Sequence, residues 1–218
     1  MRAVEVKNLT VAYGGRVIIN DFTFAAEPGE AVLVKGPSGC GKSTFLHAVC
    51  GLIPASIHAE LSGEVLIFGK SIFELSIAER AREIGIVFQN PETQLFCGSV
   101  EDEIAFGLEN LCIPRDEISR RIDEMLALIS LEKYRLASPK ELSGGQKQLV
   151  VLASVMALEP KILLLDEPLS QLDTACGQAL IARFSELKRE GRTLLMADHG
   201  EILESVADRV VDIGKGWS

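Results

Sequence analysis

The segment Gly36-Pro37-Ser38-Gly39-Cys40-Gly41-Lys42-Ser43 fits the pattern G-x-x-x-x-G-K-[ST] and decides the fold. It follows the apolar run 31–34 and leads into residues 44–49, which have helical character. In such a unit the glycines let successive backbone N–H groups point at an anion, and the helix N-terminus adds positive potential. The segment therefore predicts a phosphate-binding P-loop, with Lys42 on the β- and γ-phosphates of a nucleotide and the Ser43 hydroxyl on Mg²⁺. Its nucleotide-binding residues are Gly36, Pro37, Ser38, Gly39, Cys40, Gly41, Lys42, Ser43 and Thr44.

Further apolar runs extend the prediction outward from this loop. They lie at residues 84–88, 162–165, 193–196 and 209–213. Continuous apolar runs of this length are typical of parallel strands covered on both faces. Segments with helical spacing alternate with them, at 99–130, from 142 to about 158, and at 176–190. This alternation indicates an α/β fold.

The N-terminal part follows a different pattern. Residues 4–24 are rich in β-branched and aromatic residues and break at Gly14-Gly15, which predicts antiparallel strands. No linker is long enough to separate independent domains. We therefore expect one domain over residues 1–218, with a mainly helical part at about 90–159 inserted in the α/β core.

Composition limits the partners and the compartment. With 218 residues and 47% hydrophobic residues, the chain can bury a substantial core. Its formal charge of −9 lowers the case for nucleic acid as a partner, because phosphate contacts need clustered basic residues. The longest candidate membrane span, 149–158, is half of the ~20 residues that a spanning helix needs. The five cysteines are widely spaced without a C-x-x-C pair, so neither a disulfide framework nor a zinc site is predicted.

A second chemical signal is Ile162-Leu163-Leu164-Leu165-Asp166-Glu167-Pro168. It places two carboxylates at the carboxyl end of a predicted parallel strand, the edge at which α/β sheets bind ligands. Asp166 is predicted to hold the Mg²⁺ shell, and Glu167 to polarise the attacking water as a general base. Alone, such a strand end is most often a solvated loop; beside a P-loop, the catalytic interpretation is favoured.

The third signal is Leu142-Ser143-Gly144-Gly145-Gln146, at the start of a predicted helix. Ser143 is a capping residue and the glycines expose backbone donors, so this is another helix start suited to anions. The order of P-loop, LSGGQ and strand-Asp-Glu resembles the ATP-binding cassette (ABC) family over essentially the whole chain. This resemblance implies a P-loop NTPase fold: an α/β ABC ATPase core with a parallel sheet, an N-terminal antiparallel β-subdomain and a helical subdomain.

The resemblance also implies how the signals combine. ABC ATPases dimerise head to tail, so Ser143, Gly144, Gly145 and Gln146 would close over the ATP held by the partner's P-loop. If the partner is identical, the interface is isologous. The chain departs from the common family pattern at Gln171, where Ala is usual, and at Leu149, where Arg is usual.

Four further residues receive roles by resemblance. Tyr13 would stack on adenine, the alternative being a half-buried strand tyrosine. Gln89 would link Mg²⁺ and the attacking water to the transporter contact. Asp173 would couple the two sites of the dimer. His199 would be the switch histidine on the γ-phosphate, although a lone histidine after a strand is usually incidental.

A finer resemblance lies in the stretches 88–96, FQNPETQLF, and 100–110, VEDEIAFGLEN. They are similar to the energy-coupling factor and cobalt-uptake ATPases, which power import of vitamins or transition-metal ions. The chain is thus expected to be an ATPase that uses ATP and Mg²⁺, peripheral on the cytoplasmic face of the cell membrane. Its expected partners are a second ABC ATPase subunit, identical or not, and a transmembrane transporter subunit. Such ATPases often continue beyond the point where this chain stops, so a short form or part of a longer or tandem protein is expected.

The contact with the membrane subunit is expected near Gln89. Gln94, Leu95 and Phe96 are predicted to line a groove for a short cytoplasmic helix of the transporter. The alternative is that the two apolar side chains pack inside the helical part.

The main alternative function is a soluble ABC ATPase that acts on DNA or ribosomes. Such proteins often carry coiled-coil or zinc insertions or two cassettes, whereas this sequence has one cassette and no zinc cysteines. A nucleotide sensor without turnover would lack Glu167 or His199, and both are present.

Overall fold

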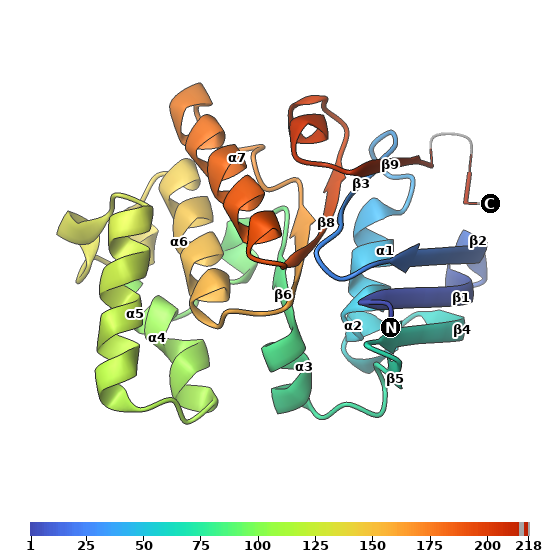
Figure 1. Ribbon diagram of the computed structural model, residues 1–218, viewed down its shortest axis with the longest axis horizontal. Helices are drawn as coiled ribbons and strands as arrows, with labels where there is room; N and C mark the ends of the chain where they lie inside the picture. Colours follow the sequence, from blue (N-terminus) through green and yellow to red (C-terminus); the bar gives the residue numbers. More distant parts are fainter. Residues whose placement is uncertain (214–215, 218) are drawn as a thin grey trace.

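The computed structural model of the protein describes residues 1–213 and 216–217 (Figure 1). Its larger sheet is parallel, with the strand order β6-β7-β8-β3-β9. In that order the strands span Ile84–Val87, Ile162–Asp166, Thr193–Asp198, Ala31–Lys35 and Arg209–Asp212. Each coincides with one of the predicted apolar runs, which confirms the α/β core.

Both faces of the parallel sheet are covered. Leu163 and Leu165 of β7 pack in one core cluster with α6 (Gly144–Ala157) and α7 (Thr174–Arg189). Ile162 and Leu164 lie in a second cluster, with α1 (Lys42–Val49) and the antiparallel strands. Because successive strand side chains point to opposite faces and both faces are covered, every position of β7 is buried, and its first four residues are apolar.

The smaller sheet is antiparallel, with the order β2-β1-β4-β5. These strands span Arg16–Ala26, Val4–Tyr13, Glu60–Ile67 and Lys70–Ser71. Gly14 and Gly15 join β1 to β2 with φ of 54° and 80°, as a two-residue hairpin turn of this hand requires. β4 is absent from the sequence-based expectation because its first half is largely exposed and polar and is interrupted by Gly63. The backbones of β1 and β4 come close together at Gly63: a Cβ there would lie 2.5 Å from the Asn8 carbonyl oxygen.

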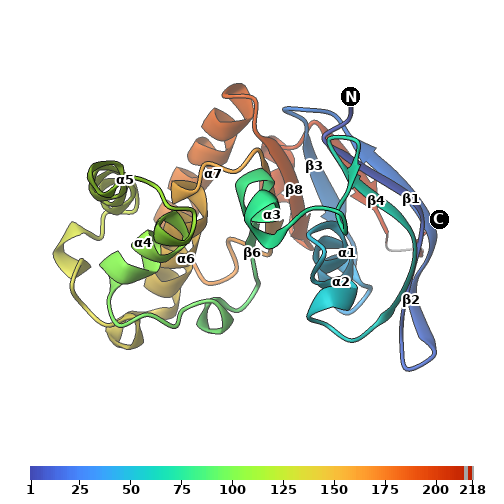
Figure 2. The same ribbon diagram turned by 90° about the horizontal axis from the view of Figure 1, so that it is seen from below.

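The segment between β6 and β7 is mainly helical, as predicted. It contains α4 (Val100–Asn110), α5 (Arg115–Leu128) and α6, with short 3-10 turns at Pro91–Thr93, Glu132–Tyr134 and Pro139–Glu141. The expected break near Pro114 is the junction of α4 and α5. Figure 2 shows α4 to α6 at one end of the molecule, the antiparallel sheet at the other and the parallel sheet between them. A subdomain division at about residues 90 and 159 stays a prediction.

Three short elements complete the fold: α2 (Leu52–Ala55), α3 (Ile77–Glu83) and a 3-10 turn, η4 (Ile202–Ser205). Within residues 1–213 and 216–217, no helix has the length and apolar character needed to cross a bilayer. What matters for the site is the edge of the parallel sheet, because the loops after β3, β6, β7 and β8 all leave its carboxyl side.

Candidate active site

The predicted P-loop joins β3 to α1. Gly39 and Gly41 take φ of 79° and 104°, values that favour glycine, and α1 begins at Lys42 directly after them. The buried Lys42 ammonium donates to the carbonyl oxygens of Gly36, at 2.8 Å, and Pro37, at 3.2 Å. These bonds engage two of its three N–H groups.

A cavity of about 240 Å³ lies beside this loop. Its lining residues come from the antiparallel sheet, the P-loop and the ends of β6 and β7: Tyr13, Ile18, Ser38, Gly39, Gly41, Lys42, Ser43, Thr44, Gln89 and Glu167. All except Ile18 are residues predicted from the sequence. Of the other predicted loop residues, Gly36 and Pro37 bond the Lys42 ammonium, and the Cys40 carbonyl accepts a bond from Trp217.

Three of the predicted catalytic side chains meet at Glu167. Its Oε2 accepts a hydrogen bond from Gln89 Nε2 at 2.7 Å, and its Oε1 lies 3.4 Å from His199 Nδ1. Glu167 is a non-glycine residue in the left-handed region, at φ 45°, and its N–H donates to the Ala197 carbonyl at 2.9 Å. A strained backbone of this kind, held by its neighbours, is common at functional sites.

Asp166 lies buried behind this group. Burial raises the pKa of its carboxyl group, and a hydrogen bond from the Ser43 side chain opposes that shift. The neighbouring charge of Glu167 raises the pKa further, whereas Lys42 lowers it. The ionised form is therefore costly here unless more positive charge comes near.

Asp198 is a site residue that sequence reasoning missed. Its Oδ1 accepts hydrogen bonds from the N–H groups of His199, at 2.6 Å, and Gly200, at 2.8 Å. The same oxygen lies 3.6 Å from His199 Nδ1. The His199 side chain is 60% exposed and has few packing contacts to hold it. The hydrogen bond from its backbone N–H to Asp198 therefore helps to keep it beside Glu167. An Asp directly before the histidine, able to cap the turn that follows β8, was the available signal.

Four residues of the LSGGQ segment line a second cavity, of about 630 Å³: Ser143, Gly144, Gly145 and Gln146. Ser143 caps α6: its Oγ accepts from Gln146 N–H at 3.3 Å, while Gln146 Oε1 accepts from Ser143 N–H at 2.9 Å. The Gln146 amide oxygen is thus engaged in a capping box. Asp173 borders the same cavity and caps α7 by accepting from Cys176 N–H at 2.8 Å, which lowers the Asp173 pKa.

Among the residues that the structure describes, the two cavities share no lining residue. Figure 1 shows the first turns of α1, α6 and α7 along one side of the molecule, the upper side in that view. The N-termini of α1 and α6, both of a kind suited to anions, therefore face the same side of the molecule.

The family model described as "ABC transporter" matches residues 19–170. The chain belongs to this family. A putative ABC transporter ATP-binding protein of Methanosarcina acetivorans is 41% identical over 217 residues, 98% of this chain and 34% of that protein. Another, of Pyrococcus abyssi, is 41% identical over 215 residues, 97% of this chain and 77% of that protein. The chain thus spans about a third of the Methanosarcina relative.

A solved structure of this ABC family supports the fold. CbiO1 from Clostridium perfringens, described as part of the ABC transporter complex cbiONQ, is 32% identical. It superposes with a TM-score of 0.80 over 97% of this chain and 84% of that one. The resemblance inferred from the sequence is therefore confirmed: the chain is an ABC ATPase similar to CbiO1, with the predicted fold class.

The paired glycines of the ABC signature make different contacts within the chain. A Cβ on Gly145 would lie 2.9 Å from the Gln171 backbone oxygen, whereas one on Gly144 would lie 2.7 Å from the tip of the Gln171 side chain. A side-chain tip moves at little cost, but backbone does not. We therefore expect Gly145→Ala to lower the free energy of unfolding by about 1–3 kcal/mol.

Gly144→Ala is the matched control, since it makes the same change one residue earlier. We expect its loss in the free energy of unfolding to be smaller than that of Gly145→Ala, because only the Gln171 side chain has to move. Urea unfolding of both variants measures the difference. Equal losses would contradict the packing of the Gln171 backbone against Gly145.

Proposed function

We propose that the chain binds Mg-ATP and hydrolyses it to drive an ABC importer of the energy-coupling factor type, for a vitamin or a transition-metal ion. The observation that carries the proposal is the convergence of Lys42, Gln89 and Glu167 on one cavity, with His199 against the Glu167 carboxylate. Hydrolysis of ATP by the wild-type chain, compared with the Glu167→Gln chain, is the test.

The residues of the cavity suit successive parts of the nucleotide. The Tyr13 ring lies on the cavity wall, where it stacks on adenine. The P-loop N–H groups and the Lys42 ammonium bind the phosphates. Glu167 takes the proton of the attacking water, while Gln89 holds one of its oxygens and His199 lies against the other. His199, exposed at the turn after β8, is placed to contact the γ-phosphate.

The residues around Asp166 fit Mg²⁺. The Asp166 carboxylate and the Ser43 hydroxyl are adjacent oxygen ligands, and Gln89 adds an amide oxygen nearby. Among the described residues there is no cluster of three or more His, Cys, Asp or Glu side chains to form an all-protein cage. A site of one carboxylate completed by substrate phosphates is typical of Mg²⁺. When bound, the ion neutralises charge on the phosphates, and its own charge offsets the cost of ionising the buried Asp166.

The second cavity suits a contact with a second cassette. Ser143, Gly144, Gly145 and Gln146 border a cavity separate from the P-loop of their own chain. We infer that they meet the γ-phosphate of ATP held by a second ABC ATPase subunit, identical or not, in a head-to-tail pair. Asp173, which shares that cavity, is placed to couple the two sites.

A groove of about 490 Å³ suits the transmembrane subunit. Its lining includes Leu95, Phe96, Lys140 and Lys147. Phe96 is 67% exposed and stacks edge-on against Phe106, with ring centres 4.7 Å apart. Large exposed aromatic side chains beside a groove are typical of docking sites for an amphipathic helix. This surface favours a transporter partner, with the chain peripheral on the cytoplasmic face of the membrane, over the soluble alternative.

One residue predicted for this groove lies elsewhere. The Gln94 side chain turns toward β6, where Oε1 accepts from Phe88 N–H at 2.7 Å and Nε2 donates to the Ile86 carbonyl at 3.0 Å. Its amide continues the hydrogen bonding of the strand end, so the prediction that Gln94 lines the groove is wrong.

We expect Leu95→Ser combined with Phe96→Ser to abolish copurification with the membrane subunits while ATP binding persists, because neither side chain lines the nucleotide cavity. Affinity capture from membranes measures the first effect and calorimetry the second. Leu136→Ser is the control, since it removes an apolar side chain that is 79% exposed and not part of the groove. Full copurification of a folded double variant would rule out this groove as the docking site. A collapsed melting temperature would instead show that the fold depends on Leu95, which packs against the core.

A further inference from the structure

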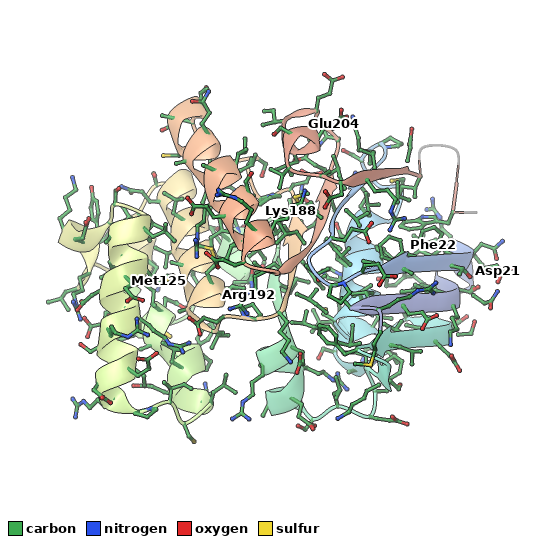
Figure 3. The ribbon with its side chains drawn as sticks, in the orientation of Figure 1. Asp21, Phe22, Met125, Lys188, Arg192 and Glu204 are labelled. Carbon is green, nitrogen blue, oxygen red and sulfur yellow. The ribbon has the colours of Figure 1, made fainter. Side chains whose placement is uncertain are left out.

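Trp217 lies against the P-loop and is not among the residues that line the nucleotide cavity. It is the single tryptophan of the chain, and its side chain is only 8% exposed. The indole N–H donates to the Cys40 carbonyl oxygen at 2.8 Å. The ring packs edge-on against Phe22 at 4.8 Å and tilted against Phe45 at 5.5 Å between ring centres. Phe22 lies on β2 (Figure 3) and Phe45 on α1, so Trp217 joins both elements to the loop.

The bonded carbonyl belongs to the peptide unit directly before α1. Gly41 forms the N-cap of this helix, at φ 104°. A Cβ there would lie 2.8 Å from Ile18 Cγ2 and 3.1 Å from Trp217 Nε1. The left-handed conformation and the two close side chains thus both require glycine at this position.

The hydrogen bond has a geometric consequence on the other side of this peptide. In a planar trans peptide the C=O and the following N–H point in opposite directions. Holding the Cys40 carbonyl toward Trp217 therefore aims the Gly41 N–H away from the indole. Gly41 also lines the nucleotide cavity. The indole thus fixes the direction of a backbone donor at the start of the phosphate-binding helix.

We propose that Trp217 is a positioning residue for nucleotide phosphate: it orients the Cys40–Gly41 peptide so that the Gly41 N–H faces the bound phosphates. The inference rests on the proposed ATP-binding function and adds a residue outside the cavity to it. We expect this donor to bind phosphate equally before and during hydrolysis. Its misalignment therefore raises KM for ATP with little change in kcat.

The test compares two variants of the same aromatic cluster. Trp217→Phe keeps a ring but removes the indole N–H, and we expect it to raise the Kd for ADP about three- to tenfold, the value of one lost hydrogen bond. Phe22→Leu disturbs the same packing but keeps the bond to Cys40, so its Kd should stay within about twofold of the wild type. Calorimetry gives the Kd values, and thermal unfolding gives the stability of each variant.

Two results would overturn the proposal. One is a Trp217→Phe chain with the wild-type Kd. The other is a rise in Kd that follows the loss of melting temperature equally in both variants, which would make the contact purely structural. Absence of ADP and ATP binding by the wild-type chain would instead overturn the proposed function together with this inference.

Fluorescence provides a test that does not depend on the folding of the Trp217 variant. Because emission comes from one tryptophan in contact with the loop, ADP should change it and saturate at the calorimetric Kd. The Lys42→Ala chain should show no change at the same ADP concentrations. Unchanged wild-type emission while calorimetry shows bound ADP would contradict the coupling of Trp217 to the loop.

Discussion

Lys42→Ala is expected to weaken binding of ATP and ADP by about 10- to 100-fold, as measured by calorimetry. The substitution removes from the cavity lining the buried Lys42 ammonium, whose hydrogen bonds to a phosphate would be charge-assisted. It also removes the hydrogen bonds from the ammonium to the carbonyl oxygens of Gly36 and Pro37, so the loop itself loses an anchor. A moderate fall in melting temperature should accompany the loss of affinity.

Lys35→Ala is the matched control for charge. Lys35 ends β3 and pairs with Glu204 at 2.5 Å, outside the lining of the cavity. Its removal changes the net charge of the chain by the same amount, yet should leave the Kd for ATP unchanged. If both lysine variants bind ATP like the wild type, Lys42 has no role in phosphate binding.

Glu167→Gln is expected to bind ATP with nearly wild-type affinity and to hydrolyse it about 10²- to 10⁴-fold more slowly. The amide keeps the volume of the side chain and an oxygen that accepts from Gln89, so the site should stay folded. It cannot take up the proton of the attacking water. Steady-state phosphate release, with the membrane partners present, measures the loss in kcat.

Glu201→Gln controls for the removal of a carboxylate near the site. Glu201 is exposed, lies two residues after His199 and is outside the lining of the cavity. Its hydrolysis rate should match the wild type. Wild-type hydrolysis by the Glu167→Gln chain would transfer the role of general base to another group.

The three candidate catalytic groups each follow a parallel strand. Gln89, Glu167 and His199 come just after β6, β7 and β8, and the register aligns the ends of these strands, with Val87 opposite Leu165 and Leu165 opposite Met196. The strand end beside a P-loop predicted the role of Glu167, whereas Gln89 and His199 were assigned through the resemblance to the ABC family. The carboxyl edge of the parallel sheet explains why the three side chains meet.

Contacts that join distant segments were not predictable in the same way. Trp217 reaches Cys40 across most of the chain, and no periodicity in the sequence indicates that hydrogen bond. The Gln94 amide hydrogen-bonds backbone groups at the end of β6, which would otherwise lack partners, and the sequence does not indicate these bonds. For Gln146 a signal was available, since Ser143 three residues before it forms a capping-box pattern.

Polar surface elements were not predicted from the sequence for another reason. None of the α3 residues is buried, so its sequence carries no apolar stripe that would indicate a helix. Its capping box of Ser76 and Glu79 was the available sign. β4 alternates poorly because the first half of the strand is largely exposed. Elements that contribute little to the core are thus the ones that apolar patterns miss.

The nucleotide left on the Glu167→Gln chain tests the central claim most directly. The chain is incubated with radiolabelled Mg-ATP, freed of excess nucleotide, and the bound label is separated into ATP and ADP. If the Glu167 carboxylate activates the attacking water, the variant retains ATP, whereas the wild type treated in the same way carries ADP. Bound ADP on both chains, formed at the same rate, would contradict a hydrolytic site built on Glu167.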